Sequence, residues 1–237
     1  MEPRYRAVKR RIVDALQNGR WGRGEAIPSE PLLARRFGVS IGTVRRAVDD
    51  LVAERILVRQ QGRGTFVVAH TRDYMLDVFF RIVDRDGRKE LPRTEQLSFR
   101  RGTAGALDAR LLGIAPGDPV WRVRTLQYLQ GAPVIVDDLR LPLELFPTID
   151  ARSFADRDAT VYGLLQQRYG VSVVRTEELI DVATADARSA ALLRVEPGTP
   201  LLRIRRTGYA YKDRPVETRL RLVSTARHRY LSLLGAR

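Results

Sequence analysis

Residues 27–51 read IPSEPLLARRFGVSIGTVRRAVDDL and decide the fold of the N-terminal part of the chain. Ser29 stands where an N-cap residue would open a helix over residues 30–37, and Gly38 ends that helix. Ser40 caps a third predicted helix, in which apolar residues recur on one face. Two short helices joined by a tight glycine-containing turn predict a helix-turn-helix.

The flanking segments complete this unit. Residues 5–16 carry apolar side chains at helical spacing and predict the first helix. Downstream, the run Gly62-Arg63-Gly64 separates two short strand-like segments. The two glycines allow close approach of the backbone to a partner, and Arg63 adds a charge there. We therefore expect a β-hairpin wing after the helices.

Charge indicates a polyanionic partner. The chain of 237 residues has a formal net charge of +14. Residues 1–70 contain 14 lysines and arginines against seven acidic residues, so half of the excess lies in under a third of the chain. Arginine dominates, and its planar guanidinium group can bind two phosphate oxygens.

Composition also excludes several classes of site. The chain has no cysteine, which rules out disulfides and cysteine-based zinc sites and fits a reducing cytoplasm. Two histidines, far apart in sequence, do not suggest a metal centre, and we expect no cofactor. No apolar run approaches the ~20 residues of a membrane-spanning helix, and the basic N-terminus lacks the apolar stretch of a secretory signal.

The motifs in residues 27–67 resemble the winged helix-turn-helix of the GntR family. The resemblance rests on Ile27-Pro28-Ser29-Glu30, Phe37-Gly38-Val39-Ser40, Thr43-Val44-Arg45 and Gly62-Arg63-Gly64-Thr65-Phe66-Val67. It implies that the third helix enters the major groove of operator DNA and that the wing reaches the minor groove. The implied DNA-binding residues are Ser29, Glu30, Ser40, Thr43, Arg45, Arg46, Gly62, Arg63 and Gly64.

Two positions depart from the family pattern. Members often carry arginines at the positions of Pro31 and Ile41, so the operator sequence cannot be taken from relatives. Arg45 is the best candidate for reading a base, whereas Arg46 serves a phosphate. The competing interpretation is that Arg45, Arg46 and Arg63 form a solvated basic face.

A repeat marks the rest of the chain. The stretch LLGIAPGDPVWRVR, residues 111–124, matches LLRVEPGTPLLRIR, residues 192–205. Each copy is followed by a second strand-like segment, at Pro133-Val134 and at Pro215-Val216. A duplicated helix and strand pair predicts a pseudo-symmetric α+β domain with an antiparallel sheet. Residues 75–83 are apolar and predict a first strand, and a second strand contains residues 97–99.

This arrangement is similar to the UTRA effector-binding domain of the HutC subfamily of GntR regulators, whose fold is chorismate-lyase-like. The resemblance implies a pocket for a small, anionic metabolite and a homodimer that binds a palindromic operator. The implied effector-binding residues are Arg122, Arg124, Asp137, Thr160 and Glu217. Alternation along a strand puts Arg122 and Arg124 on one face, and Glu217 with Arg219 and Arg221 on one face. A solvated sheet face is the alternative for each arginine pair, and Glu217 could simply neutralise Arg219.

We therefore predict an α+β protein with a DNA-binding domain over residues 1–70, a linker and first strand over 71–90 and an effector-binding and dimerisation domain over 91–237. The expected function is that of a cytoplasmic, metabolite-controlled repressor. Two alternatives remain open. One is an enzyme in which Glu217 and Asp137 perform acid–base chemistry, although no nucleophile motif is present. The other is an architectural DNA binder, which leaves the second domain without a role.

Overall fold

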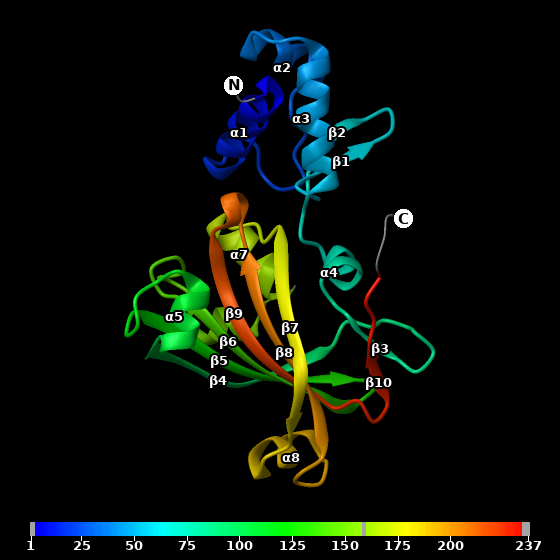
Figure 1. Ribbon diagram of the computed structural model, residues 1–237, viewed down its shortest axis with the longest axis vertical. Helices are drawn as coiled ribbons and strands as arrows, with labels where there is room; N and C mark the ends of the chain where they lie inside the picture. The colour runs from blue at the N-terminus through cyan, green and yellow to red at the C-terminus, as the bar shows by residue number, and fades with distance from the viewer. Residues whose placement is uncertain (1–2, 158–159, 234–237) are drawn as a thin grey trace. The chain divides into compact units, whose positions relative to one another are not determined.

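The computed structural model describes residues 3–157 and 160–233 of the chain (Figure 1). Its helices and strands, in chain order, are α1 (Arg4–Gln17), α2 (Glu30–Phe37), α3 (Ile41–Ala53), β1 (Leu57–Gln60), β2 (Gly64–Val67), α4 (Arg72–Val78), β3 (Ile82–Asp84), β4 (Arg93–Thr103), α5 (Ala106–Leu112), β5 (Pro119–Leu129), β6 (Ala132–Pro142), α6 (Ala151–Ala155), α7 (Val161–Tyr169), β7 (Arg175–Thr184), α8 (Ala187–Leu193), β8 (Pro200–Tyr209), η1 (Tyr211–Asp213), β9 (Pro215–Val223) and β10 (His228–Tyr230).

These elements form two compact units. The first, here called the head unit, contains the described residues through His70 together with Tyr162–Val174. The second, here called the sheet unit, contains the remaining described residues. From the sequence we expected contiguous domains with boundaries near residues 70 and 90. That expectation did not include Tyr162–Val174, which lie some 90 residues beyond His70 and belong to the head unit.

The head unit contains the predicted helix-turn-helix and wing. Ile12 of α1, Leu33 of α2, and Val44 and Leu51 of α3 are buried together in its core. The boundaries of α2 and α3 agree with the cap residues in the sequence. Strands β1 and β2 pair antiparallel and form the predicted wing. Local caps and apolar periodicity therefore determine this part of the fold.

Gln166 on α7 holds the helix within the head unit. Its buried amide nitrogen donates to the carbonyl of Val68 and to Oγ of Ser172, each at 2.9 Å. Its Oε1 accepts a hydrogen bond from the backbone N–H of His70 at 2.8 Å. One side chain thus satisfies buried backbone groups at the end of the wing, 96 and 98 residues away in sequence.

The sheet unit is built on a six-stranded antiparallel sheet in the order β4-β5-β6-β9-β8-β7. The order is symmetric about the β6–β9 pair, so each half contains one copy of the repeat. Hydrogen bonds repeat as well: Ala104 N–H donates to the carbonyl of Asp118 at 2.8 Å, and Ala185 N–H to that of Thr199 at 2.9 Å. The duplicated unit is therefore strand, helix, strand, strand, one strand longer than the sequence repeat suggested.

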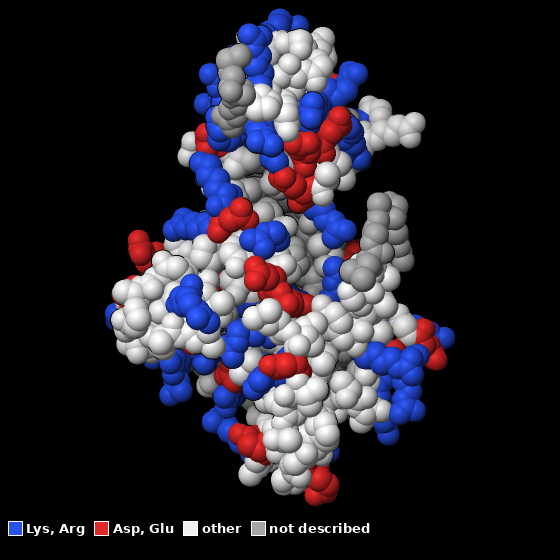
Figure 2. All heavy atoms as spheres, in the orientation of Figure 1, with Lys and Arg blue, Asp and Glu red and all other residues white. Residues whose placement is uncertain are grey.

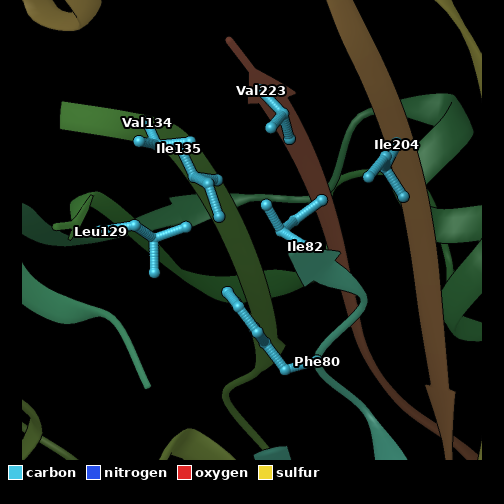
Figure 3. Packing of buried hydrophobic residues seen from close by; sticks show 7 residues of the cluster. All are labelled: Phe80, Ile82, Leu129, Val134, Ile135, Ile204 and Val223. Carbon is cyan, nitrogen blue, oxygen red and sulfur yellow. The ribbon is translucent and has the colours of Figure 1, made fainter. Parts of the chain in front are cut away.

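The two faces of this sheet, here called face A and face B, are covered by different elements. Face A carries Ile135, Ile204 and Val223, which pack with Phe80, Ile82, Leu129 and Val134 in a buried cluster (Figure 3). Face B carries Leu126, Val136 and Leu201, which pack against Ala190 and Leu193 of α8. Helix α5 covers face B in the same way through Ala109 and Leu112 against Val120. Both repeat helices therefore lie on face B.

One predicted strand is wrong. Residues 75–83, expected to be extended, divide into the end of α4, a connecting turn and β3. The side chain of Thr71 caps α4 by accepting a hydrogen bond from the N–H of Tyr74. Met75 and Phe79, four residues apart, are both buried, as on one face of a helix. A short apolar run fits a strand or a helix, and here the cap decides for the helix.

Candidate functional site

Arg45 lies on the exposed side of α3 beside an ion-pair network. Its side chain is 62% exposed, and its Nε donates to Oε2 of Glu30 at 2.9 Å. Nη2 of Arg59 on β1 donates to the other oxygen of Glu30 at 3.0 Å, and Nη1 of Arg59 also bonds Asp49. Basic and acidic side chains accordingly lie next to one another on this part of the surface in Figure 2. Glu30 is thus the carboxylate that positions two arginines.

Ser40 and Thr43 define the start of α3. Oγ of Ser40 accepts the N–H of Thr43 at 3.2 Å and lies 2.9 Å from Oγ1 of Thr43. Both side chains, predicted as DNA contacts, therefore serve the helix cap in this structure. Ser29 occupies the N-cap position of α2, but its side chain makes no capping bond within the described part of the chain.

The other predicted basic contacts lie over aromatic rings. The guanidinium carbon of Arg46 is 4.2 Å from the ring centroid of Tyr5, so this side chain stacks on α1. Arg63, at the exposed tip of the wing, lies 5.9 Å from the ring of Phe66. Gly62 and Gly64 on either side of it have φ angles of 71° and 121°, which favour glycine. Arg63 is therefore exposed on a tight turn, beside Phe66.

The sheet separates the predicted effector residues into two sets. Thr125 is the direct partner of Asp137, and Asp137 is the direct partner of Arg221, so these three share face A. Arg124 pairs with Asp138, one residue away, and therefore points to face B. Arg122 and Arg124 consequently lie on the opposite face of the sheet from Asp137 and Glu217, so the structure does not bring the five expected residues together.

On face B the two arginines have protein partners. Arg124 forms a bidentate ion pair with Asp138, with distances of 2.8 and 2.7 Å. Nη2 of Arg122 donates to the carbonyl of Thr103 at 2.8 Å. Bidentate arginine–carboxylate pairs combine charge with fixed geometry, so we assign Arg124 to the stability of the sheet.

Face A instead carries a buried polar cluster. It consists of side chains that are each at most 7% exposed, namely Thr125, Gln127, Asp137, Arg206, Glu217, Arg219 and Arg221. Nη1 of Arg219 and Nη2 of Arg221 each donate to Oδ2 of Asp137 at 3.2 Å. Nε of Arg219 also donates to Glu217 at 2.9 Å, so Glu217 does neutralise Arg219.

The charges in this cluster control its titration. Burial alone would raise the pKa of Asp137, but Arg221 and Arg219 outweigh burial and lower that pKa below its ordinary value. Arg157, which follows α6, adds another positive charge: burial and the neighbouring Arg219 lower its pKa to about 10. Asp137 is therefore ionised at neutral pH, and the cluster contains closely spaced arginines.

Some hydrogen-bonding capacity of the cluster is unused by the protein. Within residues 3–157 and 160–233, buried Oδ1 of Asp137, Oε1 of Gln127 and Nε of Arg221 have no hydrogen-bond partner. Nε of Arg157 is in the same condition. Buried polar atoms are normally paired, so such atoms on one face indicate a place for water or a polar ligand. Two acceptors and two donors would suit a ligand with hydroxyl and anionic groups.

Thr160 is half-buried and immediately precedes α7, where a helix start was expected. Sequence reasoning missed Thr125, Gln127 and Arg157, and it recognised Arg219 and Arg221 only as neighbours of Glu217 on a strand. The available signal was the alternation along β5, which places Thr125 and Gln127 on the face opposite Arg122 and Arg124.

Two family models match the chain. The model described as bacterial regulatory proteins, gntR family, matches residues 4–67, and the UTRA domain model matches residues 87–229. Among the described residues, none of the helices has the length and apolar character needed to cross a membrane.

The most similar relatives include transcriptional repressors. The chain is 30% identical to the "Probable fructoselysine utilization operon transcriptional repressor" of Escherichia coli strain K12, over 90% of this chain and 86% of the relative. It is 28% identical to the "Histidine utilization repressor" of Pseudomonas putida, over 96% and 90%. A solved ligand-binding domain of a GntR-family regulator from Bordetella bronchiseptica aligns with a TM-score of 0.63 and 34% identity, over 66% of this chain and 98% of that one.

Proposed function

Since the chain belongs to the GntR family of bacterial transcriptional regulators and carries a UTRA domain, we propose that it is a repressor whose affinity for its operator changes when a small anionic metabolite binds on face A. The observation that carries the proposal is the buried polar cluster with unpaired donors and acceptors. Relatives named as repressors support the sign of regulation.

The DNA-reading residues are those on the exposed side of α3 and at the tip of the wing. Arg45 projects from α3 with most of its side chain exposed and is our choice for a base contact. Arg63 is exposed at the tip of the wing, beside the ring of Phe66, and we assign it to the minor groove or its phosphates. Ser40 and Thr43 fix the start of α3, and we assign Arg46, which stacks on Tyr5, to a phosphate.

We place the effector on face A rather than across the five residues suggested by the motifs. Asp137, Gln127, Arg221 and Arg157 offer it the polar atoms left unpaired by the protein. The positive charges of Arg157 and the two strand arginines favour a phosphate or carboxylate. Thr160 and Glu217 remain part of this proposal, whereas Arg122 and Arg124 leave it because they face the other way.

The experiment is a titration of the complex between the full chain and DNA from upstream of its own gene. A panel of phosphorylated and carboxylated metabolites is added while the dissociation constant is followed by fluorescence anisotropy. We expect one compound to change the constant by about fivefold or more, a usual size of allosteric coupling. Arg157→Gln should abolish the response to the compound without changing the affinity for DNA in its absence. Arg152→Gln, at an exposed position, should preserve both the response and the affinity for DNA.

The sensor role would be refuted if no compound changed the dissociation constant of the complex and none raised the melting temperature of the protein. The proposed DNA binding would not be affected by that result. Turnover of a bound compound that disappears in Glu217→Gln would instead revive the enzyme alternative. Ionised Asp137, held between two arginines, makes that alternative weak because it is a poor proton acceptor.

We also propose that two copies associate through β7, one of the two edge strands of the six-stranded sheet. Leu179, Ile180 and Val182 on this strand are 64%, 43% and 68% exposed. Each carboxylate of this strand is paired with an arginine, Glu177 with Arg175, Glu178 with Arg206 and Asp181 with Arg203, so no unpaired acidic side chain guards the edge. An exposed apolar edge strand suits pairing with a second copy, as does a palindromic operator.

Light scattering after size exclusion tests this interface. Val182→Lys should shift the chain from dimer to monomer, while Leu107→Lys, at an exposed apolar position on α5, should leave the dimer intact. Dimers in both variants would remove β7 from the proposal. Since its proposed target is genomic DNA, we place the protein in the cytoplasm.

A further inference from the structure

Ile41, the first residue of α3, is exposed although it is a large apolar residue. Its exposed fraction is 44%, and in the described part of the head unit only Val58 on β1 is a comparably exposed large apolar residue. A single exposed apolar side chain does not by itself indicate a function. The position of Ile41 at the start of α3 does indicate one.

The start of α3 is the part of the unit that is best placed to meet bases. In a helix-turn-helix, the N-terminal residues of the second helix contact base edges in the major groove. The cap formed by Ser40 and Thr43 fixes this helix start. Ile41 also precedes Arg45 by four residues, so the two exposed side chains lie on the same face of α3. Whatever base edge Arg45 reaches, Ile41 lies one helical turn from it.

The surroundings of Ile41 leave room for a close approach. The next residue is Gly42, which is exposed, and a side chain added there would meet no atom within 4 Å. An isoleucine followed by glycine therefore presents one compact apolar surface at the tip of the helix. The side chain of Ile41 has no group that can donate to or accept from a base.

The one apolar group that a base presents in the major groove is the methyl group of thymine. We propose that Ile41 packs against a thymine methyl in each half-site and thereby specifies thymine at one operator position, with Arg45 reading a base nearby. This inference rests on the proposed function, namely that the head unit binds operator DNA through α3.

The test is a cycle between a protein variant and a single methyl group. Selection from a random duplex library with the full chain first defines the preferred site. Each thymine of that site is then replaced in turn by deoxyuridine, which lacks only the methyl group. Binding of wild type and of Ile41→Ala is measured for each duplex by anisotropy.

For wild type we expect one thymine per half-site at which the replacement weakens binding by roughly fourfold, the effect of losing contact with one methyl-sized group. Ile41→Ala should bind the duplex that contains thymine with an affinity lowered by a similar factor. Replacement of that thymine by deoxyuridine should not lower its affinity further. Val58→Ala, the matched control, should keep the wild-type sensitivity at that position. Ile41→Arg should replace the selected thymine by guanine, since arginine binds guanine edges.

The outcomes separate this inference from the function on which it rests. Equal losses in wild type and Ile41→Ala at every thymine overturn the role of Ile41 while sequence-specific binding stands. A selection that enriches no sequence removes the proposed operator binding, and the inference with it. Circular dichroism of Ile41→Ala verifies that an altered affinity does not arise from unfolding of the head unit.

Discussion

Nε of Arg45 on α3 donates a hydrogen bond of 2.9 Å to Oε2 of Glu30 on α2. The same carboxylate accepts a hydrogen bond from Arg59 of the wing. The arginine that we assign to a base is therefore held by a neighbouring carboxylate, which fixes its direction and reduces its effective charge. Phosphates and bases must compete with Glu30 for it.

The first prediction concerns this competition. Glu30→Gln removes one negative charge beside Arg45 and Arg59, so both become more available to phosphate. We expect the affinity for random-sequence duplex to rise and the plot of log affinity against log salt to steepen by up to about one for each freed arginine. Anisotropy titrations at several salt concentrations measure both quantities.

Glu25→Gln is the control, because it changes the net charge of the head unit by the same amount while its carboxylate serves the N–H of Gly22. It should leave the salt dependence near that of wild type. If the two variants steepen the plot equally, general charge and not the position of Glu30 explains the effect.

The second prediction concerns the buried polar cluster. Asp137→Ala leaves Arg219 and Arg221 buried without the carboxylate that both contact. Breaking a buried ion pair from one side costs about 3–5 kcal/mol of unfolding free energy. Urea denaturation should show a loss of this size, whereas Asp156→Ala, which breaks an exposed pair with Arg152, should change little. A small loss for Asp137→Ala would mean that its charge is not needed by the arginines.

The third prediction concerns pH and His70. Burial lowers the pKa of this imidazole from 6.5 to about 4, although hydrogen bonds to the backbone of Tyr162 and Val173 oppose the change. The unfolded chain then binds a proton between pH 6.5 and 4 that the folded chain excludes. Stability is therefore complete above pH 6.5 and falls as the pH decreases, by about 2 kcal/mol between pH 7.5 and 5.

His70→Gln should flatten the pH dependence of unfolding in this window. The lowered pKa values of buried carboxylates such as Asp137 act at lower pH, because an unfolded aspartate titrates near 4. Burial also lowers the pKa of His228, so His228→Gln is the necessary comparison. A wild-type profile that His70→Gln leaves unchanged would assign the effect to His228.

The head unit and the repeat were predictable because their signals are local. Cap residues and apolar spacing predict α2 and α3, and the repeated Pro-Gly turns predict the strand pairs β5–β6 and β8–β9. The place of α7 was not predictable from such signals. It depends on Gln166, whose partners His70 and Val68 are almost 100 residues away.

The family resemblance implied the five effector residues without reference to strand register, and the register of the β5–β6 hairpin divides them between the two faces of the sheet. At the tight end of the β5–β6 hairpin Leu129 pairs with Ala132, and that register, continued along the strands, would pair Arg124 with Asp137. A bulge between Gln127 and Tyr128 shifts it by one residue, so Thr125 pairs with Asp137 instead. A shift of one residue changes which side chains of the two strands share a face. No residue pattern in the strand predicts this bulge.

The central claim is that α3 reads a DNA sequence through Arg45. The most direct measurement is the dissociation constant of the full chain for DNA from upstream of its own gene and for a shuffled duplex of equal composition, with wild type, Arg45→Ala and the exposed Arg152→Ala of the sheet unit. We predict that wild type prefers the upstream DNA by about 10³-fold or more, that Arg152→Ala keeps this preference, and that Arg45→Ala loses about 1–3 kcal/mol of it. Equal affinity of wild type for both duplexes, or an Arg45→Ala variant with the full preference, would contradict the claim.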